Sequence, residues 1–129
     1  MLRTAVSRAA SPVRGAGLRG AGTVAGVIVE EQILEAGRRL SRAAPHAQVI
    51  LFGSHARGSA GPRSDIDILV IEPEVENESI ESVRLMREVG DLRLPLEVVV
   101  VSQRDAEDWR AVHGSLVHAA MTEGRVLAG

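Results

Sequence analysis

The chain has 129 residues, enough for one domain with a single core rather than two domains. It contains no cysteine, which excludes disulfides, thiolate metal sites and cysteine nucleophiles. All fifteen basic residues are arginine, which excludes a Walker-type phosphate loop and a Schiff-base lysine. No apolar run approaches the roughly 20 residues of a membrane span, so a cytoplasmic protein without a membrane partner is expected.

Residues 1–26 contain four arginines and no acidic residue, with little hydrophobic periodicity. They are predicted to form a disordered extension, followed by one folded domain over residues 27–129. Three origins fit this composition: a start codon assigned too far upstream, an organelle transit peptide, or a functional basic tail. The remaining chain holds eleven arginines against seventeen acidic residues, a formal charge of −6. An acidic domain is poorly suited to following a nucleic-acid backbone, so nucleic acid is not the expected partner.

A first helix is predicted to begin near Val29, because apolar residues recur at helical spacing, with acidic residues early and arginines late. Pro45 ends this helix. Two apolar runs, residues 47–52 and 66–72, are predicted to be buried strands. The acidic segment of residues 72–81 reads as turn-like and exposed, because it contains proline and asparagine.

The second half of the chain continues with a predicted helix over residues 80–89. A continuous β-branched run over residues 96–101 predicts a third strand, covered on both faces. Ser102 is the expected N-cap of a short helix. A last helix over residues 113–123 and an edge strand over residues 125–128 complete the order. These elements predict an α/β (α+β) fold, a short mixed sheet with helices mainly on one face.

Two carboxylates open the second predicted strand. Asp65 and Asp67 are separated by one residue, so their side chains point to the same face, roughly 6.5–7 Å apart along the chain. Glu97 lies inside the third predicted strand, where a charge is costly unless it is paired or bound to a metal. If these strands are neighbours, three carboxylates surround one or two divalent ions. Such hard oxygen ligands suit Mg²⁺, which takes its remaining ligands from water and substrate phosphates.

A Gly-Ser pair, Gly53 and Ser54, follows the first predicted strand, and ten residues separate it from Asp65. Glycine lets the backbone approach a phosphate closely, and the serine offers a hydroxyl and an N–H at the start of a turn. Arg57 and Ser64 flank the connection and are further candidate nucleotide-binding residues, although Arg57 can equally pair with a nearby acid. Each feature alone has an ordinary structural explanation. Their joint occurrence in this order indicates the handling of a metal–triphosphate.

The order of Gly53-Ser54, Asp65-Ile66-Asp67 and Glu97 resembles the signature of the minimal nucleotidyltransferases of the DNA polymerase β superfamily. The segments GSHARG and SDIDILV are similar to those of the subgroup found as small bacterial antitoxins. The resemblance covers roughly residues 30–127. It implies a polymerase β-like fold and transfer of a nucleoside monophosphate, AMP from ATP, to a hydroxyl acceptor with two Mg²⁺ ions.

The resemblance also assigns roles to the three acids. Asp65 and Asp67 would bind metal, and Glu97 would be the third ligand or the base. The third acid of this family is often aspartate, so the longer Glu97 can shift the ions or reduce activity.

A partner protein follows from the same resemblance. In the similar antitoxins, a small helical toxin of the HEPN ribonuclease class is the partner, and one of its side chains is the acceptor. The chain is too short for a separate acceptor-binding domain, so the acceptor is expected to dock from outside. Residues 72–81 can steer a basic partner, and a homo-oligomer is also possible. Two other functions stay open: an antitoxin acting by direct binding with weak or lost catalysis, and a nucleotide-binding regulator.

Overall fold

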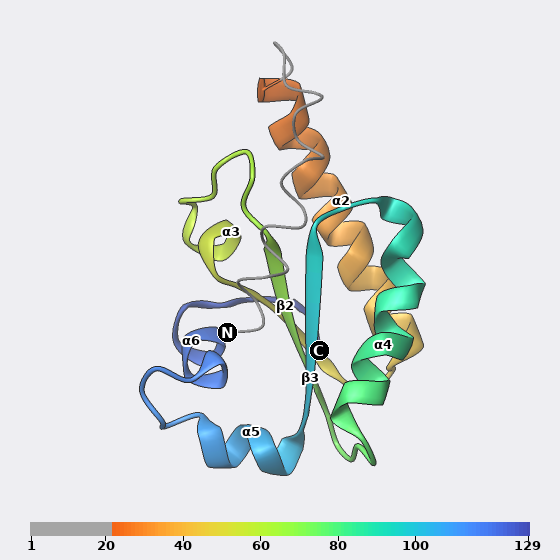
Figure 1. Cartoon of the computed structure of the whole chain (residues 1–129), viewed down its shortest axis with the longest axis vertical. Helices are drawn as coiled ribbons and strands as arrows, with labels where there is room; N and C mark the ends of the chain where they lie inside the picture. Colours follow the sequence, from red (N-terminus) through yellow and green to blue (C-terminus); the bar gives the residue numbers. More distant parts are fainter. Residues whose placement is uncertain (1–21) are drawn as a thin grey trace.

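A four-stranded mixed sheet in the order β3-β2-β1-β4 lies at the centre of the molecule (Figure 1). The structure, a computed structural model, describes residues 22–129 and the side chains from residue 30 onward. β1 (Gln48–Phe52) is antiparallel to β2 (Ile66–Glu72) and to β4 (Arg125–Ala128), whereas β2 is parallel to β3 (Leu96–Ser102). The predicted α/β fold with a short mixed sheet is confirmed, and β4 is the predicted edge strand.

Two long helices, α2 (Gly22–Ala43) and α4 (Glu78–Val89), cover one face of the sheet (Figure 1). Alternate residues of the strands point towards them, because side chains along a strand alternate between its two faces. Burial of these apolar side chains is the main favourable contribution to the stability of this layer. The main buried residues are Ile33, Ala36, Leu40, Val49, Leu51, Ile66, Ile68, Val70, Leu85, Val89, Leu96, Val98 and Val100.

Two shorter helices, α5 (Gln103–Trp109) and α6 (Leu116–Glu123), pack on the opposite face (Figure 1). The long helices thus lie on one face, as predicted, while short helices cover part of the other. Both faces of the central strands are therefore buried, which explains their continuous apolar sequence. The residues of this second core are Ile50, Phe52, Leu69, Ile71, Val101, Ala106, Val117 and Ala120.

The first helix begins earlier than its pattern predicts. α2 starts at Gly22 rather than near Val29, so residues 22–26, predicted to be disordered, are helical. Once the buried residues further along have fixed a helix, each added residue costs little, and the helix extends towards the N-terminus. The rest of the predicted extension lies outside the described residues. Within the part of the chain that is described, no helix is long and apolar enough to cross a membrane.

Polar side chains fix the start of three helices. The side chains of Asn77, Ser102 and Ser115 each accept a hydrogen bond from a backbone N–H three residues later. This confirms Ser102 as the N-cap of α5. Ser115 likewise sets the start of α6, so this helix begins at Leu116 and not at residue 113 as predicted. A short 3₁₀ turn, η1 (Gly90–Leu92), follows α4 at the glycine predicted to end it.

Candidate active site

Asp67 and Glu97 lie at paired positions of neighbouring strands. β2 and β3 run parallel, and Asp67 is the register partner of Glu97. The residues before them, Ile66 and Leu96, belong to the core under α2 and α4. Since side chains alternate along a strand, both carboxylates project to the other face, which α5 and α6 partly cover. This is the arrangement that the three-carboxylate prediction requires of these two residues.

Asp65, the remaining predicted acid, lies just before β2 and is 7% exposed. One carboxylate oxygen of Asp65 and one of Glu97 are fully buried. Burial of ionised carboxylates is costly unless they interact with other groups, and Asp65, Asp67 and Glu97 all have interactions within the protein. Over residues 22–129, no three His, Asp or Glu side chains are grouped closely enough to hold a metal ion by themselves.

Gly53 brings the backbone of the Gly-Ser turn against Asp67. β1 ends at Phe52, the register partner of Asp67 in the antiparallel ladder. Gly53 has a φ of 78°, and a Cβ atom at this position would lie 2.5 Å from Oδ2 of Asp67. Only glycine adopts this backbone conformation readily and leaves room for the carboxylate. The structure thus places the predicted turn and the predicted metal ligand in direct contact.

Ser54 opens α3 (Ser54–Arg57), a single helical turn between β1 and β2. The carbonyl of Gly53 accepts hydrogen bonds from the N–H groups of Ala56 and Arg57, at 3.0 and 3.1 Å. Gly58, with a φ of 79°, ends the turn in the left-handed conformation. The turn that the sequence predicts at Ser54 is therefore present, and it is helical.

The two remaining candidates for nucleotide binding are engaged within the protein. Nη1 of Arg57 lies 3.3 Å from Oε1 of Glu123, the last residue of α6, and both side chains are exposed. Oγ of Ser64 accepts a hydrogen bond from the N–H of Gly61 at 2.8 Å, which shapes the loop before Asp65. The sequence left open that Arg57 pairs with an acid. It did not identify Glu123, because a contact between residues 66 positions apart leaves no local pattern.

The acidic segment of residues 72–81 is only partly a turn, because its last four residues begin α4. Glu72 and Glu81 are half-buried and contact each other, and Oε2 of Glu72 is buried without a hydrogen-bond partner among the described residues. Burial, together with the Glu81 carboxylate, raises the pKa of Glu72 to about 7. The hydrogen bonds of Arg84, at 2.7 and 2.8 Å, lower the pKa of Glu81 to about 2. Arg84 thus keeps Glu81 ionised, and below about pH 7 Glu72 is the member of the pair that holds a proton.

Replacing Glu72 with Gln should stabilise the protein, relative to wild type, more at pH 8 than at pH 5. A carboxyl group whose pKa is raised on folding stabilises the folded state fully when the pH is below its pKa in the unfolded chain, near 4.5. This stabilisation is lost as the pH rises through the folded-state pKa of about 7. We expect the difference in free energy of unfolding between variant and wild type to grow by about 1 kcal/mol from pH 5 to pH 8, after allowance for solvent screening. Urea denaturation at both pH values measures it. Glu76→Gln, in the exposed part of the loop, should show no such growth.

Residues 30–120 match the model of a family described as "Nucleotidyltransferase domain". Among solved structures, a nucleotidyltransferase candidate from Sulfolobus solfataricus has a TM-score of 0.53 at 18% identity, over 86% of this chain and 89% of that chain. A toxin-antitoxin structure with AMP-PNP has a TM-score of 0.52 at 25% identity, over 74% and 73%. A complex of tri-AMPylated Shewanella oneidensis HEPN toxin with MNT antitoxin has a TM-score of 0.45 at 24% identity, over 76% and 72%.

No match to the chain is found among curated proteins. The family match nevertheless spans more than half of the chain, and it includes the Gly-Ser turn and the three predicted carboxylates. The fold of the chain is similar to that of the Sulfolobus solfataricus structure. The chain belongs to the nucleotidyltransferase domain family.

Proposed function

We propose that this protein transfers a nucleoside monophosphate, AMP from ATP, to a hydroxyl group on a partner protein. The hydroxyl oxygen bonds to the α-phosphorus of ATP and gives up its proton, while the bond to the β-phosphate breaks and pyrophosphate leaves. The observation that carries the proposal is the pairing of Asp67 with Glu97 in the β2–β3 ladder, directly beside the backbone of Gly53. Two carboxylates and a glycine turn are then neighbours on one face of the sheet, as the binding of a metal–triphosphate requires. Family membership supports the transferase class.

The carboxylates provide the donor atoms that Mg²⁺ prefers. Mg²⁺ is usually held by one or two carboxylates together with substrate phosphates, rather than by an all-protein cage. The pairing of Asp67 with Glu97 supports this case, because it brings two carboxylates to one face of the sheet. Asp65, Asp67 and Glu97 would hold the two ions of the family resemblance. When bound, the metal stabilises charge on the attacking and leaving oxygens.

The other residues of the site have distinct roles in this proposal. The turn at Gly53 lets a phosphate approach the backbone, and Ser54 offers its hydroxyl and N–H to phosphate oxygens. Glu97 either completes the metal ligands or accepts the proton of the incoming hydroxyl group. Arg57 would leave Glu123 and bind a phosphate oxygen, since a triphosphate carries more negative charge than one carboxylate. Ser64 holds the loop that positions Asp65.

A protein acceptor is favoured over a nucleic acid. Residues 27–129 carry a formal charge of −6, which repels a polynucleotide and attracts a basic protein. The similar structure with AMP-PNP is a toxin-antitoxin complex, and the sequence resemblance points to a HEPN-type toxin as the partner. Together these features support a small, basic, helical protein as the acceptor.

A second candidate function is neutralisation of such a toxin by direct binding, with weak or lost catalysis. One observation favours it: Arg57, the candidate phosphate ligand, is already paired with Glu123. A protein that acts by contact alone needs neither this arginine nor the carboxylates for its effect.

Incubation with α-labelled ATP and Mg²⁺, with and without the product of the neighbouring gene, tests the proposal. We expect label on the partner protein, a mass increase of one or more adenylate groups, and an association rate that falls as salt concentration rises. Transfer to free RNA or to a small molecule, without a protein complex, would contradict it. Full neutralisation by a variant lacking Asp65 and Asp67 would instead identify the direct-binding mechanism.

A further inference from the structure

A polar, open cavity lies between α2 and α4, away from the carboxylates of the candidate active site. Its volume is 380 Å³, and its lining residues are Arg39, Arg42, Ala43, Arg84 and Glu88. α2 and α4 cover the face of the sheet opposite to Asp67 and Glu97, so the sheet separates the cavity from these acids. Nothing in the proposed transfer reaction uses this cavity.

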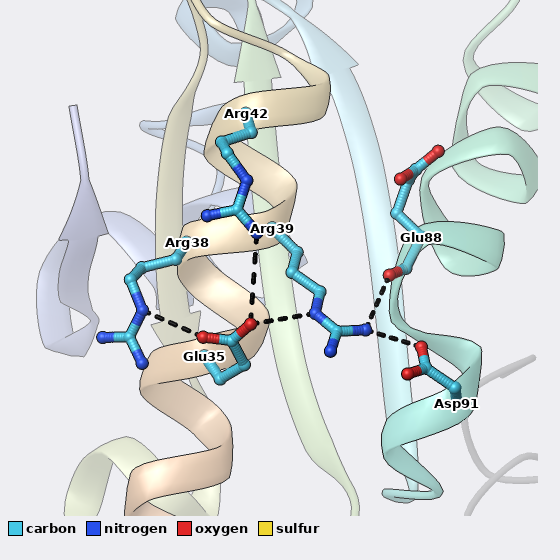
Figure 2. Close-up of polar contacts among 6 residues, drawn as sticks. All are labelled: Glu35, Arg38, Arg39, Arg42, Glu88 and Asp91. Atoms are coloured by element: carbon cyan, nitrogen blue, oxygen red, sulfur yellow. Dashed lines mark hydrogen bonds and ion pairs between the residues drawn. The ribbon is translucent and has the colours of Figure 1, made fainter.

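Two of the three arginines are held in place from both helices. Arg39 of α2 binds Glu35 at 3.0 Å and reaches across to Asp91 at 2.5 Å and to the carbonyl of Glu88 at 3.4 Å (Figure 2). Arg84 of α4 is held by both carboxylate oxygens of Glu81 and donates to the carbonyl of Ala43 at 3.0 Å. Because these side chains are already ordered, a ligand that binds them loses little further side-chain entropy.

Each arginine keeps hydrogen-bonding capacity beyond these contacts. A guanidinium group has five N–H donors. Among the described residues, no hydrogen bond is formed by Nη2 of Arg39 or by Nη1 of Arg84. Arg42 is less engaged, because its Nη2 lies 4.0 Å from Glu35 and its side chain is 68% exposed (Figure 2). With three arginines and one glutamate, the lining carries a formal charge of +2 within an otherwise acidic domain.

The lining determines the chemical class of ligand. Ala43 is its sole apolar residue, so the cavity does not suit the mainly apolar small molecules that fill most ligand pockets. Guanidinium groups bind phosphate oxygens through parallel hydrogen bonds and keep their charge at all physiological pH values. We propose that the α2–α4 cavity binds a compact, multiply charged anion of the phosphate class, with Arg42 as the principal new ligand and Arg39 and Arg84 as fixed donors.

The carboxylates around the cavity limit the strength of this site. Glu35, Glu81 and Asp91 already neutralise part of the arginine charge, so a doubly or more highly charged anion is needed to compete. Pyrophosphate should therefore bind more tightly than phosphate, and both should bind more weakly as salt is added.

Titration of the full chain with inorganic pyrophosphate in metal-free buffer tests the site. Binding is measured by calorimetry and by the chemical shifts of the arginine Nε–H groups and of the Ala43 and Glu88 amides. We expect Arg42→Ala to weaken pyrophosphate binding by about fivefold or more, the loss of roughly one charge-assisted hydrogen bond. Arg104→Ala, which removes the same charge from an exposed position on α5, should change binding less than twofold.

Three results would overturn the proposal. Absence of pyrophosphate binding by the wild-type protein is the first. Equal weakening by Arg42→Ala and Arg104→Ala would show general charge attraction instead of a site. Weaker binding in Arg57→Ala, the candidate phosphate ligand near the acids, with Arg42→Ala unaffected, would place the anion at the candidate active site. This test does not depend on transfer activity, so the cavity and the proposed function can fail separately.

Discussion

Replacing Asp67 with Asn should reduce nucleotide transfer by at least about a hundredfold, while the fold is retained. A metal ion contributes several kcal/mol to the stabilisation of a phosphoryl-transfer transition state, and each 1.4 kcal/mol corresponds to a factor of ten in rate. Asparagine keeps the shape of the side chain beside Gly53 but removes the negative charge. The rate of adenylate transfer from labelled ATP to the partner protein measures the effect.

The melting temperature separates this loss from unfolding. Asp67 and Glu97 are like charges at paired positions, an arrangement that destabilises a sheet. Removing one charge should therefore leave the melting temperature unchanged or raise it. Asp108→Asn, at an exposed position on α5, is the matched control and should alter neither activity nor stability. Transfer close to the wild-type rate in Asp67→Asn would exclude the proposed mechanism.

Replacing Gly124 with Ala should destabilise the protein by about 3 kcal/mol. The backbone of Gly124 has a φ of −79°, which alanine adopts freely, so backbone strain is not the cause. A Cβ atom would instead collide with the carbonyl oxygen of Ala120, and it would lie 2.5 Å from Cγ2 of Ile50 and 3.0 Å from the carbonyl oxygen of Leu51. Because two of these neighbours are backbone atoms, α6 must move away from β1 to make room.

Gly90→Ala is the matched control for this prediction. Gly90 has helical dihedral angles, and a Cβ atom there would meet nothing within 4 Å. We expect this substitution to be neutral or to stabilise by up to about 1 kcal/mol, because it restricts the unfolded chain. Thermal unfolding should place the Gly124 variant more than about 10 °C below the Gly90 variant. Equal melting temperatures would show that the junction between α6 and β4 is more adaptable than its packing indicates.

The strands could be predicted closely because each is continuously apolar. β2 begins and ends at the predicted residues 66 and 72, and β3 extends only one residue beyond its predicted end at 101. Both are buried on two faces, so their burial is visible in the composition of the segment itself. The first residues of the helices were harder to predict. They depend on one side chain, such as that of Ser115, or on propagation from a buried segment, as at Gly22.

The residues of the candidate site could be predicted better than their arrangement in space. Asp65, Asp67 and Glu97 stand out as acids at or within apolar strands, and Gly53 precedes a visible turn. The sequence does not show that β2 and β3 are neighbours, that Phe52 pairs with Asp67, or that Arg57 meets an acid of α6. These are contacts between distant segments, and no local periodicity reports them. The roles of these residues in binding and catalysis stay predictions for the experiments above.

The position of β4 has a consequence for how the protein is made. β1, whose other neighbour is β2, gains its second partner only from residues 125–128, at the far end of the described chain. During synthesis, the hydrogen-bonding edge of β1 therefore stays open until residues 125–128 have left the ribosome. An open edge is a template for pairing with another chain. A nascent chain that stalls before residue 125 is consequently more prone to aggregate than one in which β4 has paired with β1.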